Sequence, residues 1–537
     1  MHERQVSAGR LSDLRDGEMK EVSVDGSGVL LARVDGECFA VGANCPHYGA
    51  PLAEGALSGG RMVCPWHHAC FDVRTGDCEE APAFDSLPRF EVTIDGDEIL
   101  LHLPEKMPDR RTPPMSPRDP ADERVFVILG GGAAGYMAAQ TLREDGFTGR
   151  VLLISREGRP PYDRPNLSKD YLQGHAEPGW MPLRPSEFYE EHGIEILLGK
   201  AAARVDTAEK TITFEDGEIL SFDSLLIATG GVPRQLPFEA GTPLENVLTL
   251  RSFADTDAIM ATAGDDAKAV VIGASFIGME AACSLKVRGC DVTVVAPDSV
   301  PFEKTLGTEI GRLFRGIHER NGVNFKLGSH VRNFIGKGRA DGVLLENGEV
   351  LAADLVLVGV GVDPATDVIR GVGLHEDGGV IADGRLRIAE DVYAAGDIAH
   401  FPDARTGEIT RIEHWRTAMQ QGRTAAHNMA GKPVVFAGVP FFWTDHFGST
   451  LRYVGHARDW DRIMFDGEVG SEEFLAYYIK DHRILAVAGM NRDADLAVWE
   501  ELIRLNLVPS PSELEGRSTG PEPAASVFPE VRASPSL

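Results

Sequence analysis

The stretch VFVILGGGAAGYMAAQTLRE, residues 125–144, determines the kind of fold expected for this 537-residue chain. An apolar run is followed at once by glycines at Gly130, Gly132 and Gly135, and an amphipathic helical pattern comes after them. This order predicts a strand, a tight turn and a helix whose free backbone N–H groups can bind a pyrophosphate.

The same order occurs a second time in AVVIGASFIGMEAACSLKVRG, residues 269–289. Its phosphate-binding positions are Gly273, Ser275 and Gly278, where a serine replaces the middle glycine and can donate its own hydroxyl. Two such βαβ units in succession predict two Rossmann-like α/β dinucleotide-binding domains.

The sequence on either side of these two units has other hydrophobic patterns. Segments 28–41 (GVLLARVDGECFAV) and 89–103 (RFEVTIDGDEILLHL) alternate polar and apolar residues between Gly or Asp-Gly turns, which predicts an N-terminal antiparallel β domain. A proline-rich stretch after it predicts a stiff linker, and short aromatic strands before the helical segment 493–507 predict a C-terminal α+β domain. We therefore expect a multidomain chain divided as follows: β domain, 1–104; linker, 105–122; first nucleotide domain, 123–250 and 380–437; second nucleotide domain, 251–379; α+β domain, 438–513; disordered tail, 514–537.

Two short motifs in the β domain combine cysteine with histidine. CPHYGAPL contains Cys45 and His47, and CPWHHACFD contains Cys64 and His67. Two thiolates and two imidazoles on two loops match a 2Fe-2S cluster in which the cysteines hold one iron and the histidines hold the other. A zinc site more often pairs C-x2-C with H-x3-H, so we expect the cluster, while the adjacent His68 leaves a swapped ligand open.

These two loops and the following segment FDVRTGD resemble the Rieske family. High-potential Rieske proteins add a cysteine to each loop, and a serine and a tyrosine that donate hydrogen bonds to the cluster. At those positions this sequence has Ala50, Trp66, Ala69 and Phe71. The resemblance therefore implies a cluster at the low-potential end of the range. The sequence departs from the family at His68, where glycine is usual.

The first nucleotide domain has the pattern of an FAD site. Glu157 lies twenty-two residues beyond Gly135, after the strand-like VLLIS, where a carboxylate can bind the adenine ribose. The segments LLIATGGVPR and VYAAGDIAHF resemble the two other FAD signatures of flavoproteins with two dinucleotide-binding domains, as in glutathione reductase. This resemblance assigns Thr229, Gly230 and Asp397 to FAD, with Asp397 at the ribityl chain.

Two further segments, PPYDRPNLSK and EHWRTAMQQG, resemble the ferredoxin-reductase branch of the pyridine nucleotide-disulfide oxidoreductase superfamily. The resemblance implies that Arg164 and Lys169 lie beside the isoalloxazine ring and that Trp415 packs near it. It also implies that Glu280, on the second glycine-rich helix, pairs with Lys169 near the path of the hydride.

The nicotinamide cofactor is expected to be NADH rather than NADPH. Ala296 stands where a ribose-binding carboxylate is usual, and Asp298 is close enough to replace it in part. No arginine that could bind a 2′-phosphate appears between Val295 and Gly311.

Both places where disulfide reductases of this fold carry a redox dithiol lack one, so we expect electrons to leave the flavin through the cluster. Over nearly its whole length the chain resembles apoptosis-inducing-factor-like proteins with an N-terminal Rieske domain and their bacterial relatives. We expect an oxidoreductase that passes electrons from NADH through FAD to a Rieske cluster and on to an unidentified acceptor, which a redox protein would suit. Two alternatives stay open: an NADH-sensing flavoprotein that acts through partner binding or dimerisation, and the reductase component of an oxygenase system.

Composition limits the partners and the compartment. The net charge of −29 makes nucleic acid and anionic membrane poor partners, and no apolar run is long enough for a spanning helix. The N-terminus has no apolar signal region, and the seven cysteines do not form the pattern of a disulfide framework. We expect a soluble, cytoplasmic protein, with a homodimer left open.

Overall fold

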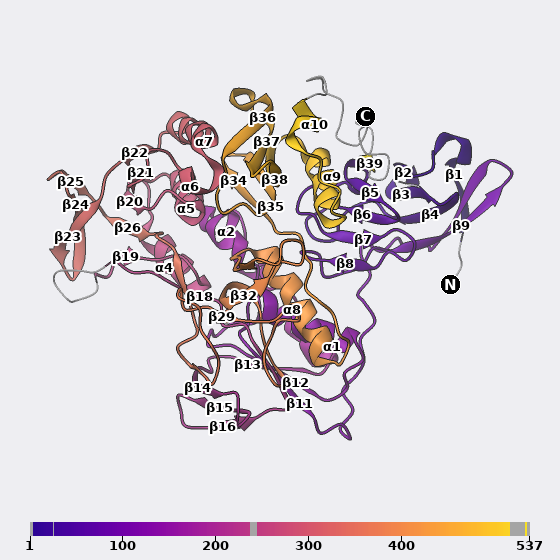
Figure 1. The fold of residues 1–537 in the computed structure, drawn as a ribbon, viewed down its shortest axis with the longest axis horizontal. Coiled ribbons are helices and arrows are strands. Elements are labelled where there is room, and N and C mark those ends of the chain that lie inside the picture. The colour runs from indigo at the N-terminus through magenta and orange to yellow at the C-terminus, as the bar shows by residue number, and fades with distance from the viewer. Residues whose placement is uncertain (1–3, 25, 237–243, 516–531, 534–537) are drawn as a thin grey trace.

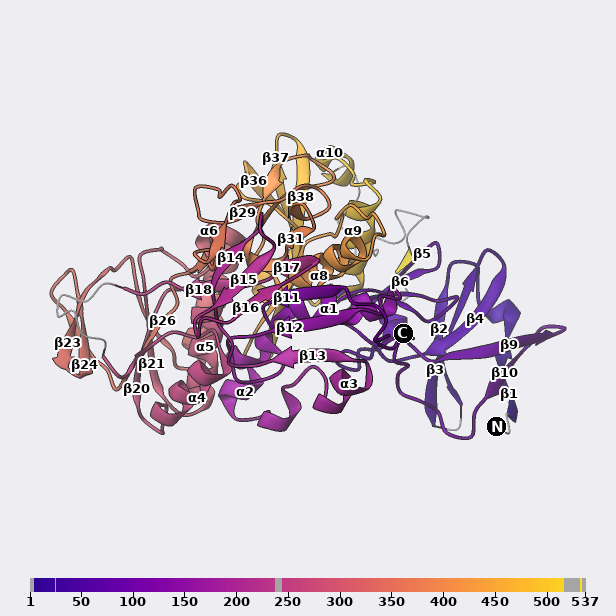
Figure 2. The same cartoon turned by 90° about the horizontal axis from the view of Figure 1, so that it is seen from below.

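The structure, a computed structural model, describes residues 4–24, 26–236, 244–515 and 532–533. It contains an antiparallel β domain, two α/β domains with parallel sheets and an α+β domain, which confirms the predicted fold class. The β domain lies at one end of the molecule and the second α/β domain at the other, with the remaining two domains between them (Figures 1 and 2). None of the helices in the described part of the chain has the length and apolarity to cross a membrane.

The N-terminal β domain consists of two antiparallel sheets. The strands of the larger sheet are, in spatial order, β1 (Arg4–Arg10), β10 (Glu98–Leu103), β9 (Arg89–Asp95), β4 (Glu37–Gly42), β3 (Ser27–Val34) and β2 (Met19–Val24). Asp35 and Gly36 join β3 to β4 with φ angles of 55° and 81°, the left-handed pair that a type I′ hairpin turn requires. The smaller sheet carries both Cys/His loops, and its strands are β5 (Ala56–Ser58), β6 (Arg61–Val63), β7 (Cys70–Asp72) and β8 (Cys78–Glu80).

The first α/β domain has a six-stranded sheet whose inner strands are parallel. Its strands are β13 (Ile194–Leu197), β12 (Arg150–Ile154), β11 (Val125–Leu129), β17 (Ser224–Ile227), β31 (Val392–Ala394) and β30 (Arg387–Ala389). The inner strands β17 and β31 are buried along their whole length, because helices and loops cover both faces of a parallel sheet. Helices α1 (Ala133–Glu144) and α8 (Trp415–Met429) lie side by side on it, so the chain returns to this domain after completing the second one.

The second α/β domain is inserted between the two halves of the first. Its parallel sheet consists of β19 (Val247–Leu248), β26 (Leu355–Val358), β20 (Lys268–Ile272), β21 (Asp291–Ala296) and β22 (Asn324–Leu327). Its helices are α4 (Phe253–Thr262), α5 (Phe276–Val287), α6 (Glu303–Leu306) and α7 (Thr308–Arg320). A capping box between Ser252 and Asp255 satisfies backbone N–H groups where α4 begins. An antiparallel extension consists of β23 (Val331–Lys337), β24 (Arg339–Leu345) and β25 (Val350–Ala352).

The C-terminal domain is a five-stranded antiparallel sheet with two helices. Its strands are β34 (Phe441–His446), β35 (Ser449–Gly455), β38 (Arg483–Met490), β37 (Glu473–Lys480) and β36 (Arg462–Glu468), followed by α9 (Asp493–Arg504) and α10 (Pro511–Glu515). Shorter elements complete the chain: α2 (Asp170–Gln173), α3 (Ser186–Glu191), β14 (Ala202–Asp206), β15 (Thr211–Phe214), β16 (Ile219–Ser221), β18 (Gly231–Pro233), β27 (Val362–Pro364), β28 (Ile369–Arg370), β29 (Val380–Ile381), β32 (Ala399–Pro402) and β33 (Ile409–Thr410).

The β domain shares a hydrophobic core with the C-terminal domain. Val63 and Cys70 of the small β sheet are fully buried in one cluster with Phe441, Trp499 and other apolar residues of β34 and α9. Ala81 is buried in a second cluster, against α1 and α8 of the first α/β domain. Because apolar burial is the main favourable term in association, these shared cores hold the β domain against the rest of the molecule.

The C-terminal tail differs from the sequence-based expectation where it is described. Residues 514–515 end α10, and β39 (Arg532–Ala533) pairs with the β5 edge of the small β sheet. An unpaired strand edge offers a row of backbone donors and acceptors, which is why a polar tail can add a strand there. Residues 516–531 and 534–537 of the predicted disordered tail lie outside the described residues.

Candidate functional site

The two Cys/His loops have the same backbone design. In the first, the Gly49 N–H donates to the Cys45 carbonyl over 2.8 Å, and in the second the His68 N–H donates to the Cys64 carbonyl over 3.2 Å. Gly49 has φ 79° and its counterpart His68 has φ 57°, so both loops turn through a left-handed residue. The turns bring the two motifs to face each other where the chain passes from β6 to β7.

Four side chains from these loops converge as the spacing predicts. The Nδ1 atoms of His47 and His67 lie 3.1 Å apart, and the neighbouring Cys64 thiol and burial raise the pKa of Cys45 well above its usual value. Burial lowers the pKa of His47 to about 3, and burial together with His47 lowers the pKa of His67 well below its usual value. Neutral imidazole nitrogens that face one point, opposite two thiols, are the donor set of a Rieske 2Fe-2S cluster, so the residues present fit that group.

His68 points elsewhere. Its Nδ1 bonds to the carboxylate of Glu500 in α9, and its ring stacks on Phe441 of β34 with centroids 4.1 Å apart. The ring of His67 instead lies against Trp443, two residues further along β34, at 4.3 Å. This division favours His67 over His68 as the ligand.

The first glycine-rich turn leaves room for a ligand only where a ligand is expected. A Cβ at Gly130 or Gly135 would lie 2.1 Å from the Ala228 carbonyl or 1.9 Å from the Gly130 carbonyl, so side chains are excluded there. A Cβ at Gly132, the N-cap of α1, would meet nothing within 4 Å. Free N–H groups at an open helix N-terminus fit the pyrophosphate of FAD.

Two arginines and two carboxylates are linked by hydrogen bonds beyond this turn. Arg164 donates to the carboxylate of Glu157 over 2.8 Å and also to the Arg251 carbonyl, and Arg251 donates to Asp397 over 2.6 Å. The structure thus links Arg164 to Glu157, the carboxylate predicted at the adenine ribose. The position of Arg164 beside the isoalloxazine ring stays a prediction. Arg251 carries no motif, and sequence reasoning missed it.

Three further predicted FAD residues lie at the ends of elements of this domain. Thr229 and Gly230 follow β17, where the Thr229 hydroxyl donates to the Ala365 carbonyl over 2.7 Å and Gly230 has φ 69°. Trp415 is the first residue of α8 and packs against the core of the first α/β domain.

The structure brings Lys169 and Glu280 into contact. The Lys169 Nζ lies 2.7 Å from the Glu280 carboxylate, which is only 4% exposed. Ser168 and Thr444 donate their hydroxyls to the same carboxylate over 2.5 and 2.7 Å. Three donors hold this buried negative charge between the two α/β domains and the C-terminal domain.

The second glycine-rich turn repeats the geometry of the first. A Cβ at Gly273 would lie 2.2 Å from the Gly359 carbonyl, and one at Gly278 would lie 2.2 Å from the Gly273 carbonyl. Ser275 is the exposed N-cap of α5, and its side chain makes no capping hydrogen bond. The turn therefore fits a second dinucleotide pyrophosphate.

Two residues at the end of β21 bear on the choice of nicotinamide cofactor. Ala296 is buried, and Asp298, beyond it, forms an ion pair with the exposed Lys304 at 2.9 Å. The acidic residue predicted for the ribose is therefore accessible, but Lys304 offsets part of its charge.

Strand β34 connects the two sites. Trp443 lies against the His67 ring, and the next residue, Thr444, donates to Glu280. Sequence reasoning missed both residues, because nothing in the local pattern of PFFWTDHFG distinguishes them from core residues. Tyr48 of the first cluster loop adds a second connection through its hydroxyl, which donates to Asp163, just before Arg164.

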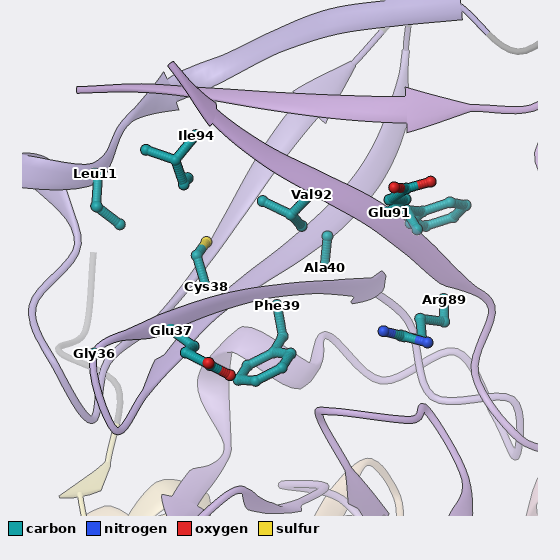
Figure 3. A pocket seen from close by; sticks show the side chains of 11 residues that line it. Leu11, Gly36, Glu37, Cys38, Phe39, Ala40, Arg89, Glu91, Val92 and Ile94 are labelled. Atoms are coloured by element: carbon teal, nitrogen blue, oxygen red, sulfur yellow. The ribbon is translucent and has the colours of Figure 1, made fainter. Parts of the chain in front are cut away.

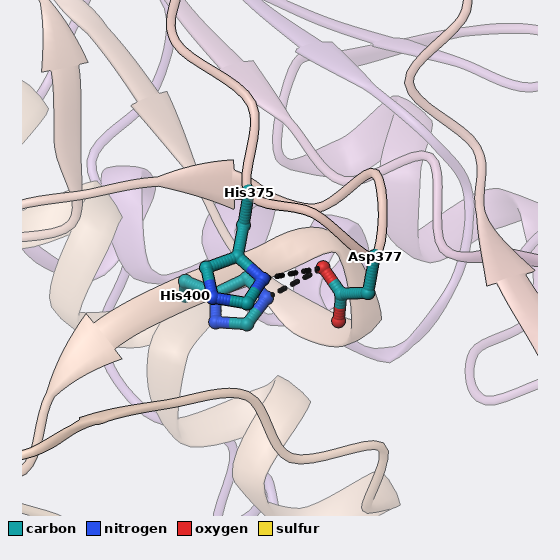
Figure 4. A group of neighbouring side chains, drawn as sticks. All are labelled: His375, Asp377 and His400. Atoms are coloured by element: carbon teal, nitrogen blue, oxygen red, sulfur yellow. Dashed lines mark hydrogen bonds and ion pairs between the residues drawn. The ribbon is translucent and has the colours of Figure 1, made fainter.

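A separate cluster of His375, Asp377 and His400 resembles a metal site in composition (Figure 4). The Asp377 carboxylate lies 3.2 Å from the His375 ring and 2.8 Å from the His400 ring, and it accepts from Arg411 over 2.8 Å. The guanidinium already neutralises the carboxylate, and Arg411 also donates to the Asp397 carbonyl. We interpret the cluster as support for the loop that carries Asp397.

A cavity of about 420 Å³ opens on the large β sheet between β4 and β9 (Figure 3). Its only thiol is Cys38, and burial raises the pKa of that thiol to about 11, so it stays protonated. A protonated thiol is a poor nucleophile and metal ligand, and the cavity has no part in the site described above.

Comparison with known families gives three matches along the chain. Residues 4–91 match the Rieske [2Fe-2S] domain, residues 124–422 match the pyridine nucleotide-disulphide oxidoreductases, and residues 441–520 match the reductase C-terminal domain.

Individual relatives agree with these matches. Apoptosis-inducing factor 3 of Homo sapiens is 38% identical over 505 residues, which cover 92% of this chain and 83% of the relative. The benzene 1,2-dioxygenase system ferredoxin–NAD(+) reductase subunit of Pseudomonas putida is 32% identical over 391 residues, which cover 72% of this chain and 94% of the relative. A chain in the crystal structure of the covalent putidaredoxin reductase–putidaredoxin complex superimposes with a TM-score of 0.71 and 29% identity, over 74% of this chain and 97% of that one.

Proposed function

The chain belongs to the pyridine nucleotide-disulphide oxidoreductase family and carries a Rieske domain, and from this premise we propose that it passes electrons from NADH through FAD to its own cluster and then to a one-electron acceptor. It is an FAD-dependent NADH oxidoreductase of the ferredoxin-reductase type. FAD, when bound, takes up a hydride as an electron pair and releases the electrons one at a time.

The chain's own residues supply binding and positioning. We assign the cluster to Cys45, His47, Cys64 and His67. We assign FAD to Gly130, Gly132, Gly135, Glu157, Arg164, Lys169, Thr229, Gly230, Asp397 and Trp415, and the nicotinamide nucleotide to Gly273, Ser275, Gly278 and Asp298. Lys169 and Glu280 have the catalytic role in this proposal. Glu280 holds the Lys169 ammonium at the junction of the domains, where the ammonium would orient the reacting rings.

One observation carries the proposal. Consecutive residues of β34 contact the two sites, since Trp443 packs on the ligand His67 and Thr444 donates to Glu280. A single strand therefore separates the cluster loop from the Lys169–Glu280 pair. This short separation supports direct transfer within one molecule, without an external ferredoxin between flavin and cluster.

The acceptor we propose is a redox protein. The chain's relatives include a ferredoxin–NAD(+) reductase subunit of a dioxygenase system and a reductase solved in covalent complex with putidaredoxin. These names support a role as the reductase component of an oxygenase system. The NADH sensor and the homodimer stay predictions.

We propose a cytoplasmic location. All seven cysteines lie in the described part of the chain and none forms a disulfide, as is usual in a reducing compartment.

The test is anaerobic rapid mixing of the holoprotein with NADH. Flavin bleaching at its visible absorption band should be followed by a Rieske EPR signal with the low average g value of mixed Cys/His ligation. Flavin that stays reduced while the cluster stays oxidised would contradict the proposal and favour the NADH sensor.

A further inference from the structure

We propose that His68 is a positioning residue that ties the second cluster loop to the reductase, so that the ring of its neighbour His67 faces Trp443. The inference rests on the proposed transfer of electrons to the cluster and adds a residue to it. His68 is not a ligand in this assignment. It acts through the backbone and through His67.

The backbone of His68 needs an outside anchor. Its counterpart in the first loop is Gly49, and both residues turn the chain in the left-handed region, with φ 79° and 57°. Glycine adopts that region freely, whereas a residue with a side chain does so at a cost. A histidine there persists when its surroundings hold it, and such positions concentrate at functional sites.

The anchor comes from two elements of the reductase. The His68 side chain is fully buried, with Nδ1 on the Glu500 carboxylate of α9. Arg416 of α8 donates to the same carboxylate over 2.6 Å and to the His68 carbonyl over 2.8 Å. Glu500 and Arg416 are themselves 1% and 0% exposed, so each of these charged bonds is shielded from water.

The anchor sets the register of the loop on β34. Phe441 and Trp443 lie on one face of the strand with ring centroids 6.2 Å apart, and His68 stacks on the first while His67 lies against the second. The rings of the neighbouring loop residues His67 and His68 thus pack on the two aromatic rings that β34 presents on that face. Release of His68 would free His67 to leave Trp443 while the loop could still bind its iron.

Two substitutions separate the anchor from the backbone conformation. His68→Gly keeps the left-handed turn and removes the anchor, whereas His68→Asn places an amide nitrogen where Nδ1 lies, and asparagine tolerates this region. In His68→Gly holoprotein we expect the Rieske EPR signal and the rate of flavin reduction by NADH to be retained. The buried charged hydrogen bond that keeps His67 against Trp443 is lost in this variant. Flavin-to-cluster transfer should therefore slow about tenfold or more. In His68→Asn the transfer rate should stay within about threefold of wild type, because the donor to Glu500 is kept.

A second readout needs no electron transfer. Hydrogen–deuterium exchange of the loop amides around His68, measured by mass spectrometry, should rise in His68→Gly and stay low in His68→Asn. The matched control is Asp85→Asn, which breaks a buried pair between the β domain and Arg184 outside both loops. This control should leave the exchange of the cluster loop unchanged.

Wild-type rates of transfer and exchange in His68→Gly would overturn the role of His68 while leaving the proposed function intact. An Asp85→Asn variant that slows transfer as much as His68→Gly would also overturn it, because domain docking in general would then be the cause. A wild-type protein that reduces its flavin and never its cluster would overturn the proposed function and this role with it.

Discussion

Glu280 is the residue on which the flavin side of the proposed mechanism depends most. Its buried carboxylate accepts from Lys169, Ser168 and Thr444. Glu280→Gln keeps the shape and removes the charge, so the Lys169 ammonium loses its partner. A hydrogen bond to a charged group contributes about 1.5–3 kcal/mol, so flavin reduction by NADH should slow about ten- to hundredfold in rapid mixing.

The control for this change is Asp391→Asn, which removes an exposed ion pair with Lys210. Exposed pairs contribute little, and this variant should reduce its flavin at the wild-type rate. If Glu280→Gln and Asp391→Asn reduced their flavin at the same rate, Glu280 would have no role in the proposed mechanism.

Cofactor preference is a second property set by single residues. Asp298 lies at the end of β21, and a 2′-phosphate beside it would be repelled, although Lys304 offsets part of that charge. We expect kcat/KM for NADH to exceed that for NADPH by about one to two orders of magnitude. Asp298→Ala should narrow this gap in steady-state assays with both nucleotides, and equal use of the two nucleotides by the wild type would contradict the assignment.

At the scale of elements, α8 carries a buried ionic contact between domains. Arg416 is fully buried and donates to Ala81, His68, Val439 and Glu500. Arg416→Leu would leave the Glu500 carboxylate buried without its cation, which costs about 3–5 kcal/mol. Differential scanning calorimetry should show the transition that includes the β domain at a lower temperature.

Arg423 on the same helix provides the control. It also reaches the β domain, through the Cys78 and Glu79 carbonyls, but its side chain is 24% exposed. Arg423→Leu should lower stability by about 1 kcal/mol or less. Equal losses of stability in Arg416→Leu and Arg423→Leu would mean that the buried Arg416–Glu500 pair contributes no more than a partly exposed contact.

The elements themselves were predictable because their signals are local. The strand, glycine turn and helix at 125–144 and 269–289 occur where the pattern places them, as does most of the helix predicted at 493–507, which ends at Arg504. The contacts between elements were not predictable. His68 and Glu500 are separated by 432 residues, and no pattern in either segment refers to the other.

The candidate site shows the same division. Gly130, Gly273 and the Cys/His motifs could be proposed from the sequence because backbone geometry or metal chemistry demands their residue types. Trp443 and Thr444 were missed because an aromatic residue and a threonine on a strand are ordinary core residues. Only the packing of β34 between two domains gives them a role.

At the scale of the whole molecule, the β domain is joined to the reductase by more than its linker. Cys70 and Val63 share a core with Trp499, while Arg184 and Asp85 form a buried ion pair at 2.6 Å. A domain held by apolar and ionic contacts together is not expected to swing freely. We therefore expect the acceptor to approach a docked cluster.

Cutting the chain after Pro113 tests this arrangement. The large fragment keeps both glycine-rich turns and the Lys169–Glu280 pair, so it should bind FAD and be reduced by NADH at the wild-type rate. It should lose most of its activity toward one-electron protein acceptors, because the cluster is absent. The small fragment has hydrophobic clusters of its own and should fold and hold its cluster.

Mixing the two fragments should restore cluster reduction, because the same surfaces that dock in one chain can dock in two. Arg416 and Glu500 are buried in the intact chain and become hydrated in the free large fragment. Added salt therefore screens their charges before the fragments associate more than after they have docked. Salt should therefore slow association more than dissociation, which stopped-flow mixing at several ionic strengths can measure. If the large fragment alone reduced every protein acceptor at the undiminished rate, electrons would leave directly from the flavin, and the cluster would lie off the main path.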